Sequence, residues 1–166
     1  MNTTRRLRTT VVAAILLAAP LLSSCGVNFD AQTDQDYMPG LGVNDRSGTV
    51  DVLHALVVSG SAGSGTVVAA LVNNNQETPD RLVEVTGAAD QGTQVTLSGG
   101  PLDIPADGAL QLANEGDVTV TGDRVAAGKF VTLSFAFENS ETITVEAPVY
   151  ANTDDFADVP VPSGTN

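Results

Sequence analysis

The sequence predicts an all-β domain, a sandwich or a barrel, between residues 45 and 150. Apolar and polar residues alternate there in short runs, as they do in strands that bury one face. Glycine, asparagine and proline separate these runs, and no amphipathic helix of useful length interrupts them. Eight or nine short strands with this punctuation are typical of sandwiches and barrels.

The first two expected strands differ in pattern. Residues 50–58 alternate, and their apolar face carries Val50, Val52, His54, Leu56 and Val58. A glycine- and serine-rich loop at 60–65 follows, which we expect to be a flexible hairpin. Residues 66–72 are then apolar on both faces, which predicts a central strand that is buried on two sides.

The remaining strands are shorter, except for a final pair. Short apolar runs at 82–85, 95–97, 110–112 and 118–120 each predict one strand. Residues 131–137 alternate strictly, and residues 143–147 continue the alternation beyond a turn at Asn139 and Ser140. The last two runs are therefore expected to form a β-hairpin.

Residues 1–24 have the pattern of a bacterial lipoprotein signal peptide. Three arginines precede an apolar stretch at 11–22, which is shorter than the roughly 20 residues that span a bilayer. The stretch ends in Leu22-Ser23-Ser24-Cys25, the lipobox pattern of an aliphatic residue and two small residues before a cysteine. A chance cysteine beside an ordinary signal is the alternative, but the chain holds no other cysteine. Cys25 is thus expected to carry the lipid and to begin the mature protein.

The mature chain is strongly acidic. Without residues 1–24 it keeps four basic and 20 acidic residues, a net charge of −16. Such a surface repels nucleic acid and anionic headgroups, which excludes both as partners. Membrane contact is expected only through the lipid on Cys25, which places the protein on the outer face of the cytoplasmic membrane.

Two polar segments flank the expected domain. Residues 25–44, the lipid-bearing cysteine and an acidic stretch broken by Pro39-Gly40, predict a flexible tether. Residues 151–166 contain three aspartates and two prolines without an apolar period, which predicts a disordered acidic tail.

The order of the segments resembles a known family. A strand ending at Asn73-Asn74 precedes Pro79-Asp80-Arg81-Leu82, and Ile104-Pro105, a turn at Gly116 and a Gly128-to-Phe135 strand follow. This order is similar to that of copper chaperones of the PCu(A)C type, specifically their actinobacterial lipoprotein branch. The resemblance implies a cupredoxin-like Greek-key β-sandwich.

The resemblance also implies where copper ligands would stand. The family's late His-x-Met element falls on Asp117 to Thr119, its earlier histidine near Ser98, and its Met-bearing loop on residues 99–101. None of these positions supplies an imidazole or a thioether, which Cu(I) prefers. The resemblance thus extends to the fold, and the His/Met copper motif is missing.

Few other residues are candidates for chemistry. His54, Met38 and Asp117 are the candidate metal ligands, with His54 expected at the core or rim of the first strand. The chain has no Gly-x-Ser-x-Gly element, and the loop at 60–65 lacks the lysine and helix of a phosphate cradle. We therefore predict no catalytic residue and no enzyme.

Two main functions remain open at this point, and an envelope hydrolase is a third, for which the sequence holds no motif. The first is a non-enzymatic envelope lipoprotein that binds a protein or small-ligand partner and needs no cofactor. The alternative is a chaperone for copper or another metal, with a site rebuilt around His54, Met38 and acidic groups or completed by a partner.

Overall fold

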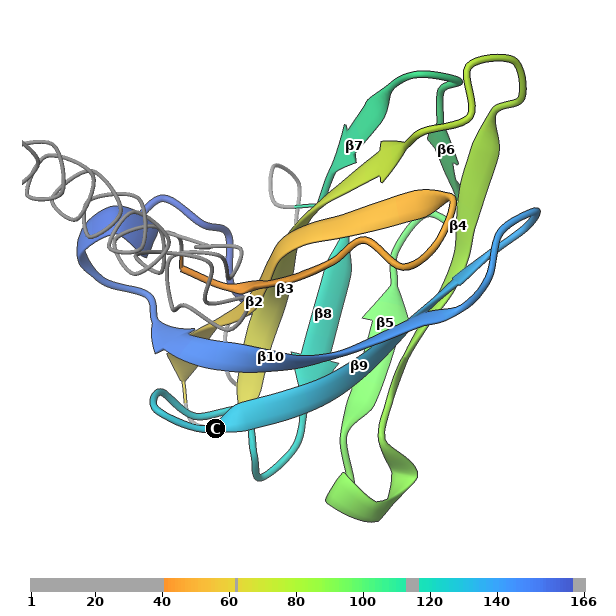
Figure 1. Ribbon diagram of the computed structural model, residues 1–166. Helices are drawn as coiled ribbons and strands as arrows, with labels where there is room; N and C mark the ends of the chain where they lie inside the picture. Colours follow the sequence, from red (N-terminus) through yellow and green to blue (C-terminus); the bar gives the residue numbers. More distant parts are fainter. Residues whose placement is uncertain (1–40, 62, 113–116, 163–166) are drawn as a thin grey trace, which may run out of the picture. The chain divides into compact units, whose positions relative to one another are not determined.

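A computed structural model describes residues 41–61, 63–112 and 117–162, in which ten strands and two short 3-10 helices form (Figure 1). This confirms the expected all-β fold. The first five strands are β1 (Val43–Asp45), β2 (Val50–Ser61), β3 (Ser64–Asn73), β4 (Asp80–Gly87) and β5 (Gln94–Leu97). The others are β6 (Leu102–Ile104), β7 (Ala109–Gln111), β8 (Val118–Thr121), β9 (Phe130–Phe137) and β10 (Ile143–Ala151). The 3-10 helices are η1 (Ala89–Gln91) and η2 (Asp154–Phe156).

The strands form one curled sheet with the order β5-β8-β3-β2-β10-β9-β4-β6. Strand β10 belongs to both layers of the resulting sandwich. Residues 143–148 pair antiparallel with β9, whereas residues 149–151 pair parallel with β2. The hydrophobic core lies between the layers and draws side chains from both, among them Val52 and Leu71 from one and Leu82 and Phe135 from the other.

Two of the expected elements are confirmed closely. Strand β3 pairs with β2 along its length and with β7 and β8 on its other edge, so it is a central strand. Strands β9 and β10 form the expected hairpin, with Phe135 opposite Ile143 and Val131 opposite Ala147. The alternating residues Val131, Leu133 and Phe135 are fully buried, as the pattern predicted.

The predicted position of His54 is wrong, because β2 contains a bulge at this residue. The β2–β3 register shifts between Leu53 and Leu56, and His54 has a left-handed φ of 54°. The extra residue changes the phase of the alternation, so Ala55 continues the core face of β2 in place of His54. The His54 side chain is exposed, and its backbone N–H donates a hydrogen bond to Asn44 Oδ1 at 2.5 Å.

The ends of the domain also differ from the expected boundaries. Strand β1 begins at Val43, within the segment predicted to be a tether. Residues 152–162 follow a defined path where the sequence predicted a disordered tail. The Asn152 amide donates to the Phe156 carbonyl at 2.7 Å, and the Thr66 hydroxyl donates to the Pro160 carbonyl at 2.5 Å. Local hydrogen bonds and a contact with β3 thus replace the apolar period that the segment lacks.

Within the described ranges, no helix is long and apolar enough to cross a membrane.

Candidate functional site

The structure brings together the positions at which the resemblance placed copper ligands. Ser98 directly follows β5, Asp117 directly precedes β8, and these two strands pair through Leu97 and Val118. The Ser98 backbone N–H donates to the Asp117 carbonyl oxygen at 2.7 Å. Thr119 lies two residues farther along β8, opposite Thr96. The three positions therefore share one end of the β5–β8 pair.

The side chains at this end of the pair offer oxygen atoms. Asp117 and Thr119 are half-buried and Ser98 is exposed. Carboxylate and hydroxyl oxygens are hard donors that suit calcium or magnesium better than Cu(I). The adjoining turn offers only backbone atoms as ligands, because Gly99 and Gly100 have no side chains. Both take left-handed φ values, 80° and 86°, that glycine adopts without strain.

The other candidate ligands do not join Asp117. His54 lies on β2, and β3 separates β2 from β8 in the sheet. Met38 and Cys25 fall outside the described residues, as does the predicted signal peptide. Across residues 41–61, 63–112 and 117–162, no group of three or more His, Cys, Asp or Glu side chains is arranged to hold a metal ion.

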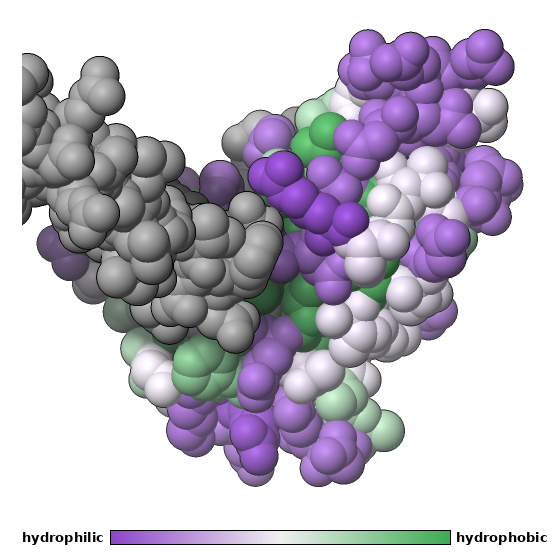
Figure 2. All heavy atoms as spheres, viewed as in Figure 1, coloured by the Kyte–Doolittle hydropathy of each residue, from purple (hydrophilic) through white to green (hydrophobic). Residues whose placement is uncertain are grey.

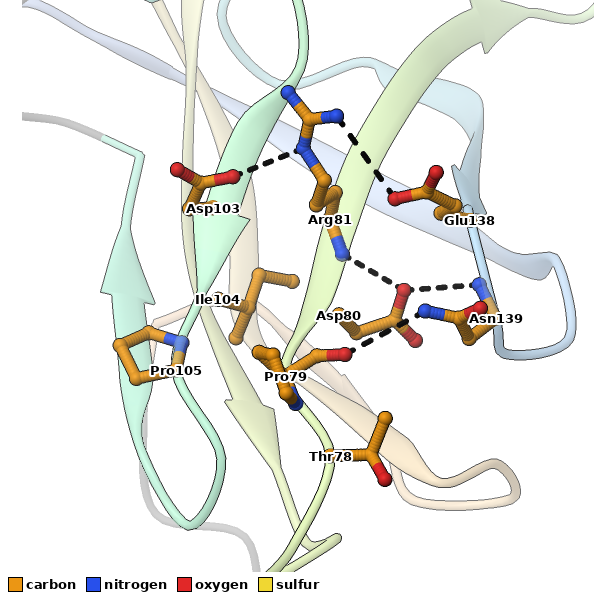
Figure 3. A pocket seen from close by; sticks show the side chains of 9 residues that line it. All are labelled: Thr78, Pro79, Asp80, Arg81, Asp103, Ile104, Pro105, Glu138 and Asn139. Carbon is orange, nitrogen blue, oxygen red and sulfur yellow. Dashed lines mark hydrogen bonds and ion pairs between the residues drawn. The ribbon is translucent and has the colours of Figure 1, made fainter.

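A cavity of about 530 Å³ lies where the β9–β10 turn meets the start of β4 (Figure 3). Its central group is Asp80, which is 3% exposed. The Asp80 carboxylate accepts hydrogen bonds from the Ser140 hydroxyl at 2.5 Å and from the backbone N–H groups of Arg81 at 2.7 Å and Asn139 at 3.0 Å. Burial raises the pKa of Asp80, but these hydrogen bonds outweigh it, so the pKa lies below its ordinary value of 3.8.

The rim of this cavity carries one cation between two anions. The Arg81 guanidinium lies 2.9 Å from the Asp103 carboxylate and 3.9 Å from that of Glu138 (Figure 3). All three side chains are substantially exposed, so the pairs are partly screened by solvent. The Asp80 hydrogen bonds fix the β9–β10 turn, and the Arg81–Asp103 ion pair joins β4 to β6. Both groups therefore have a structural role. Sequence reasoning used Asp80-Arg81-Leu82 only as a mark of resemblance and missed this role.

Comparisons with known structures confirm the expected cupredoxin-like fold. The copper-bound PCuAC domain from PmoF2 superimposes with a TM-score of 0.53 at 19% identity, over 66% of this chain and 98% of that domain. The apo PCuAC domain from PmoF1 gives 0.54 at 20% identity, over 66% and 99%. The apo PmoF2 domain gives 0.52 at 18%, over 66% and 95%. At these identities the likeness shows the fold.

Comparison of the sequence with known protein families identifies the family of this chain. No curated protein matches the chain significantly. The profile of the family described as "Putative lipoprotein LpqE-like" matches residues 49–149, which is more than half of the chain and almost the whole described sandwich. The chain therefore belongs to the LpqE-like family, and the resemblance to the lipoprotein branch of the PCu(A)C-type proteins is confirmed.

Proposed function

We propose that the protein is a non-enzymatic binding module, anchored through a lipid on Cys25 to the outer face of the cytoplasmic membrane. The observation that carries this proposal is the donor set at the β5–β8 end. The backbone there keeps the two positions adjacent, with Ser98 N–H bonded to the Asp117 carbonyl, but their side chains are those of a serine and an aspartate. A fold of the copper-chaperone type thus presents a surface better suited to a protein or small ligand than to Cu(I).

The surface chemistry supports an extracytoplasmic role without nucleic acid. The full chain has a formal net charge of −13, and hydrophilic residues cover much of the face shown in Figure 2. Negative charge of this size repels phosphate backbones and anionic lipid headgroups. Attachment to the membrane then depends on the lipid, which agrees with the family's description as lipoproteins.

One observation favours the alternative, a chaperone for copper or another metal with a relocated site. The bulge that moves His54 out of the core also exposes its imidazole. An exposed imidazole is available to a metal ion, and a partner protein would supply the remaining ligands. Asp117 takes no part in such a site, because β3 lies between the two strands.

Anaerobic titration with Cu(I) against a competing chelator separates the two functions. The protein is the chain without residues 1–24 that carries Cys25→Ser, because an unlipidated thiol would itself bind Cu(I). We expect the chelator to keep the copper, and His54→Ala to leave the titration unchanged. One equivalent of Cu(I) held by the protein and released by His54→Ala would establish the metal chaperone instead.

A further inference from the structure

Residues 157–162 lie against β2 and β3, and we call this segment the strap. The chain reaches it from the end of β10 through η2 (Figure 1), and the strap itself belongs to no strand. The Thr66 hydroxyl of β3 donates to the Pro160 carbonyl at 2.5 Å. The Val161 side chain lies so close to Gly60 of β2 that a Cβ at Gly60 would overlap it. The strap therefore contacts both strands.

The surface beneath the strap is apolar, and it faces away from the core. Val57 and Val67 belong to the core, so alternation along the strands turns Val58 and Thr66 to the opposite face. These two residues are partners in the β2–β3 register, and both are 0% exposed. The strap contacts Thr66 itself and also Gly60, which is two residues from Val58. The next pair of partners on this face consists of Leu56 and Val68. The strap thus helps to close a second apolar layer on the outside of the sheet.

Thr66 is the polar group of this surface. A hydroxyl that is fully buried needs a hydrogen-bond partner within the fold, and the Pro160 carbonyl supplies it. A backbone carbonyl of an extended chain is therefore the acceptor that this position receives. When the strap leaves, water or the carbonyl of another chain takes its place.

The strap resembles a bound ligand more than a strand. Its sequence includes Val159-Pro160-Val161-Pro162, and the prolines have no N–H to pair with a strand edge. Val159 and Val161 are half-buried while Pro160 between them is exposed, so alternate residues turn toward the domain. The turn that leads to the strap contains Asp154 with a left-handed φ of 52°, which is strained for a residue other than glycine. Release of the strap lets this turn relax.

We propose that the strap is a releasable cover of a binding site, and that this site takes an extended partner segment in which apolar residues alternate with proline. The strap itself selects this ligand class, because the segment seen on the surface has this pattern and another chain can make the same contacts. The partner segment places a carbonyl on Thr66 and an apolar side chain on Gly60 in place of the strap. This inference rests on the proposed binding function and names its site and its ligand class.

The tethered strap competes strongly with a partner segment. A segment joined to its site by a short linker acts at an effective concentration in the millimolar range. A free segment of equal intrinsic affinity therefore binds the closed protein much more weakly than the open one. A substitution that weakens the strap and leaves the site intact should then admit the partner segment.

Binding of a labelled peptide to the lipidated full chain in detergent tests this proposal. The probe is the fluorescein-labelled peptide amide Asp-Val-Pro-Val-Pro-Ser, which has the sequence of residues 158–163. Its control has the same six residues in the order Pro-Pro-Val-Val-Ser-Asp, which keeps the composition and breaks the alternation. Val161→Asp opens the strap, because a charged side chain is not accommodated on an apolar surface. We expect fluorescence anisotropy to show that this variant binds the probe at least about ten-fold more tightly than the wild type, and that neither protein binds the control peptide.

Matched variants locate the effect. Val83→Asp places the same charge on an exposed valine of β4 and should leave probe binding at the level of the wild type. Thr66→Val, added to Val161→Asp, keeps the shape of the side chain, removes the donor and should weaken probe binding about five-fold or more. Thr96→Val, at an exposed threonine of β5, should leave it unchanged. Equal binding by the wild type and Val161→Asp, or binding that does not depend on Thr66, would overturn the proposal.

Other occupants give distinct results. If the strap docks on a second copy of the chain, the wild type forms dimers that Val161→Asp dissociates in analytical ultracentrifugation, which refutes a partner segment. If deletion of residues 26–40 admits the probe and Val161→Asp does not, the N-terminal segment covers the site and the proposal fails. A chain that binds neither Cu(I) nor the probe keeps the proposed binding function and loses only this site.

Discussion

The Ser140 hydroxyl donates a hydrogen bond to the buried Asp80 carboxylate at 2.5 Å, which ties the β9–β10 turn to the first residue of β4. The two residues are 60 positions apart in the sequence. Asp80 also accepts the backbone N–H of Asn139 in the same turn. One carboxylate thus fixes the hairpin that carries much of the core.

Replacement of Asp80 by alanine is expected to lower the free energy of unfolding by about 2–3 kcal/mol, because it leaves buried donors without an acceptor. The matched control is Asp103→Ala, which removes an exposed partner of Arg81 and should cost less than about 1 kcal/mol. Urea unfolding followed by circular dichroism measures both. Equal losses for the two variants would show that the Asp80 network contributes no more than a surface ion pair.

The same carboxylate predicts a dependence on pH. The pKa of Asp80 is lowered in the folded state, so its contribution to stability is present above 3.8 and is lost as pH falls through the folded value. The stability difference between the wild type and Asp80→Asn should therefore be largest near neutral pH and shrink below about pH 3.8. Urea unfolding of both proteins from about pH 6 to pH 2.5 checks this, and a difference that grows in acid would contradict it.

Gly60→Ala tests the path of the C-terminal segment. A Cβ at Gly60 would overlap the Val161 side chain, so the variant should displace residues 157–162 from the sheet. We expect hydrogen exchange of these residues to increase while exchange in β9 stays slow. The control is Gly48→Ala, because a Cβ there would first meet the flexible end of the Ile143 side chain, at 3.0 Å, and none of its three nearest atoms belongs to the C-terminal segment.

Cys25→Ala tests the anchor. The variant should lose lipidation and leave the membrane fraction, either as unprocessed chain or as soluble protein. Fractionation and the intact mass of the protein report the change. A mature protein of unchanged mass in the membrane fraction would remove the lipid from the proposed function.

The sequence predicted the hairpin and the central strand well, since both depend on local alternation. Residues 131–137 carry a pattern of period two that no other element fits, and residues 66–72 are apolar on both faces. Such patterns predict burial correctly because successive side chains of a regular strand point to opposite faces of the sheet.

The position of His54 could not be predicted in the same way. A bulge adds one residue to a strand, and it is recognised from the register of that strand with its partner. The alternation of residues in β2 alone does not contain this register. The role of Asp80 is a similar case, because its donors come from a turn far along the chain. The C-terminal segment was expected to be disordered because its sequence has no apolar period. Its contacts do not depend on such a period; one of them joins the rings of Tyr150 and Phe156, whose centroids are 5.3 Å apart.

The parallel pairing of β2 with β10 has a consequence for the folding of the chain. Strand β1 pairs with β2 at Val52 and Ala55, but residues 57–59 on the same edge of β2 pair only with residues 149–151 of β10, which are made much later. A nascent chain that ends before Val149 leaves residues 57–59 of β2 open to pairing with other chains. Pairing between such distant segments is also slow, since a long loop must close first. Factors that delay aggregation are therefore expected to matter most until residues 149–151 are available to pair with β2.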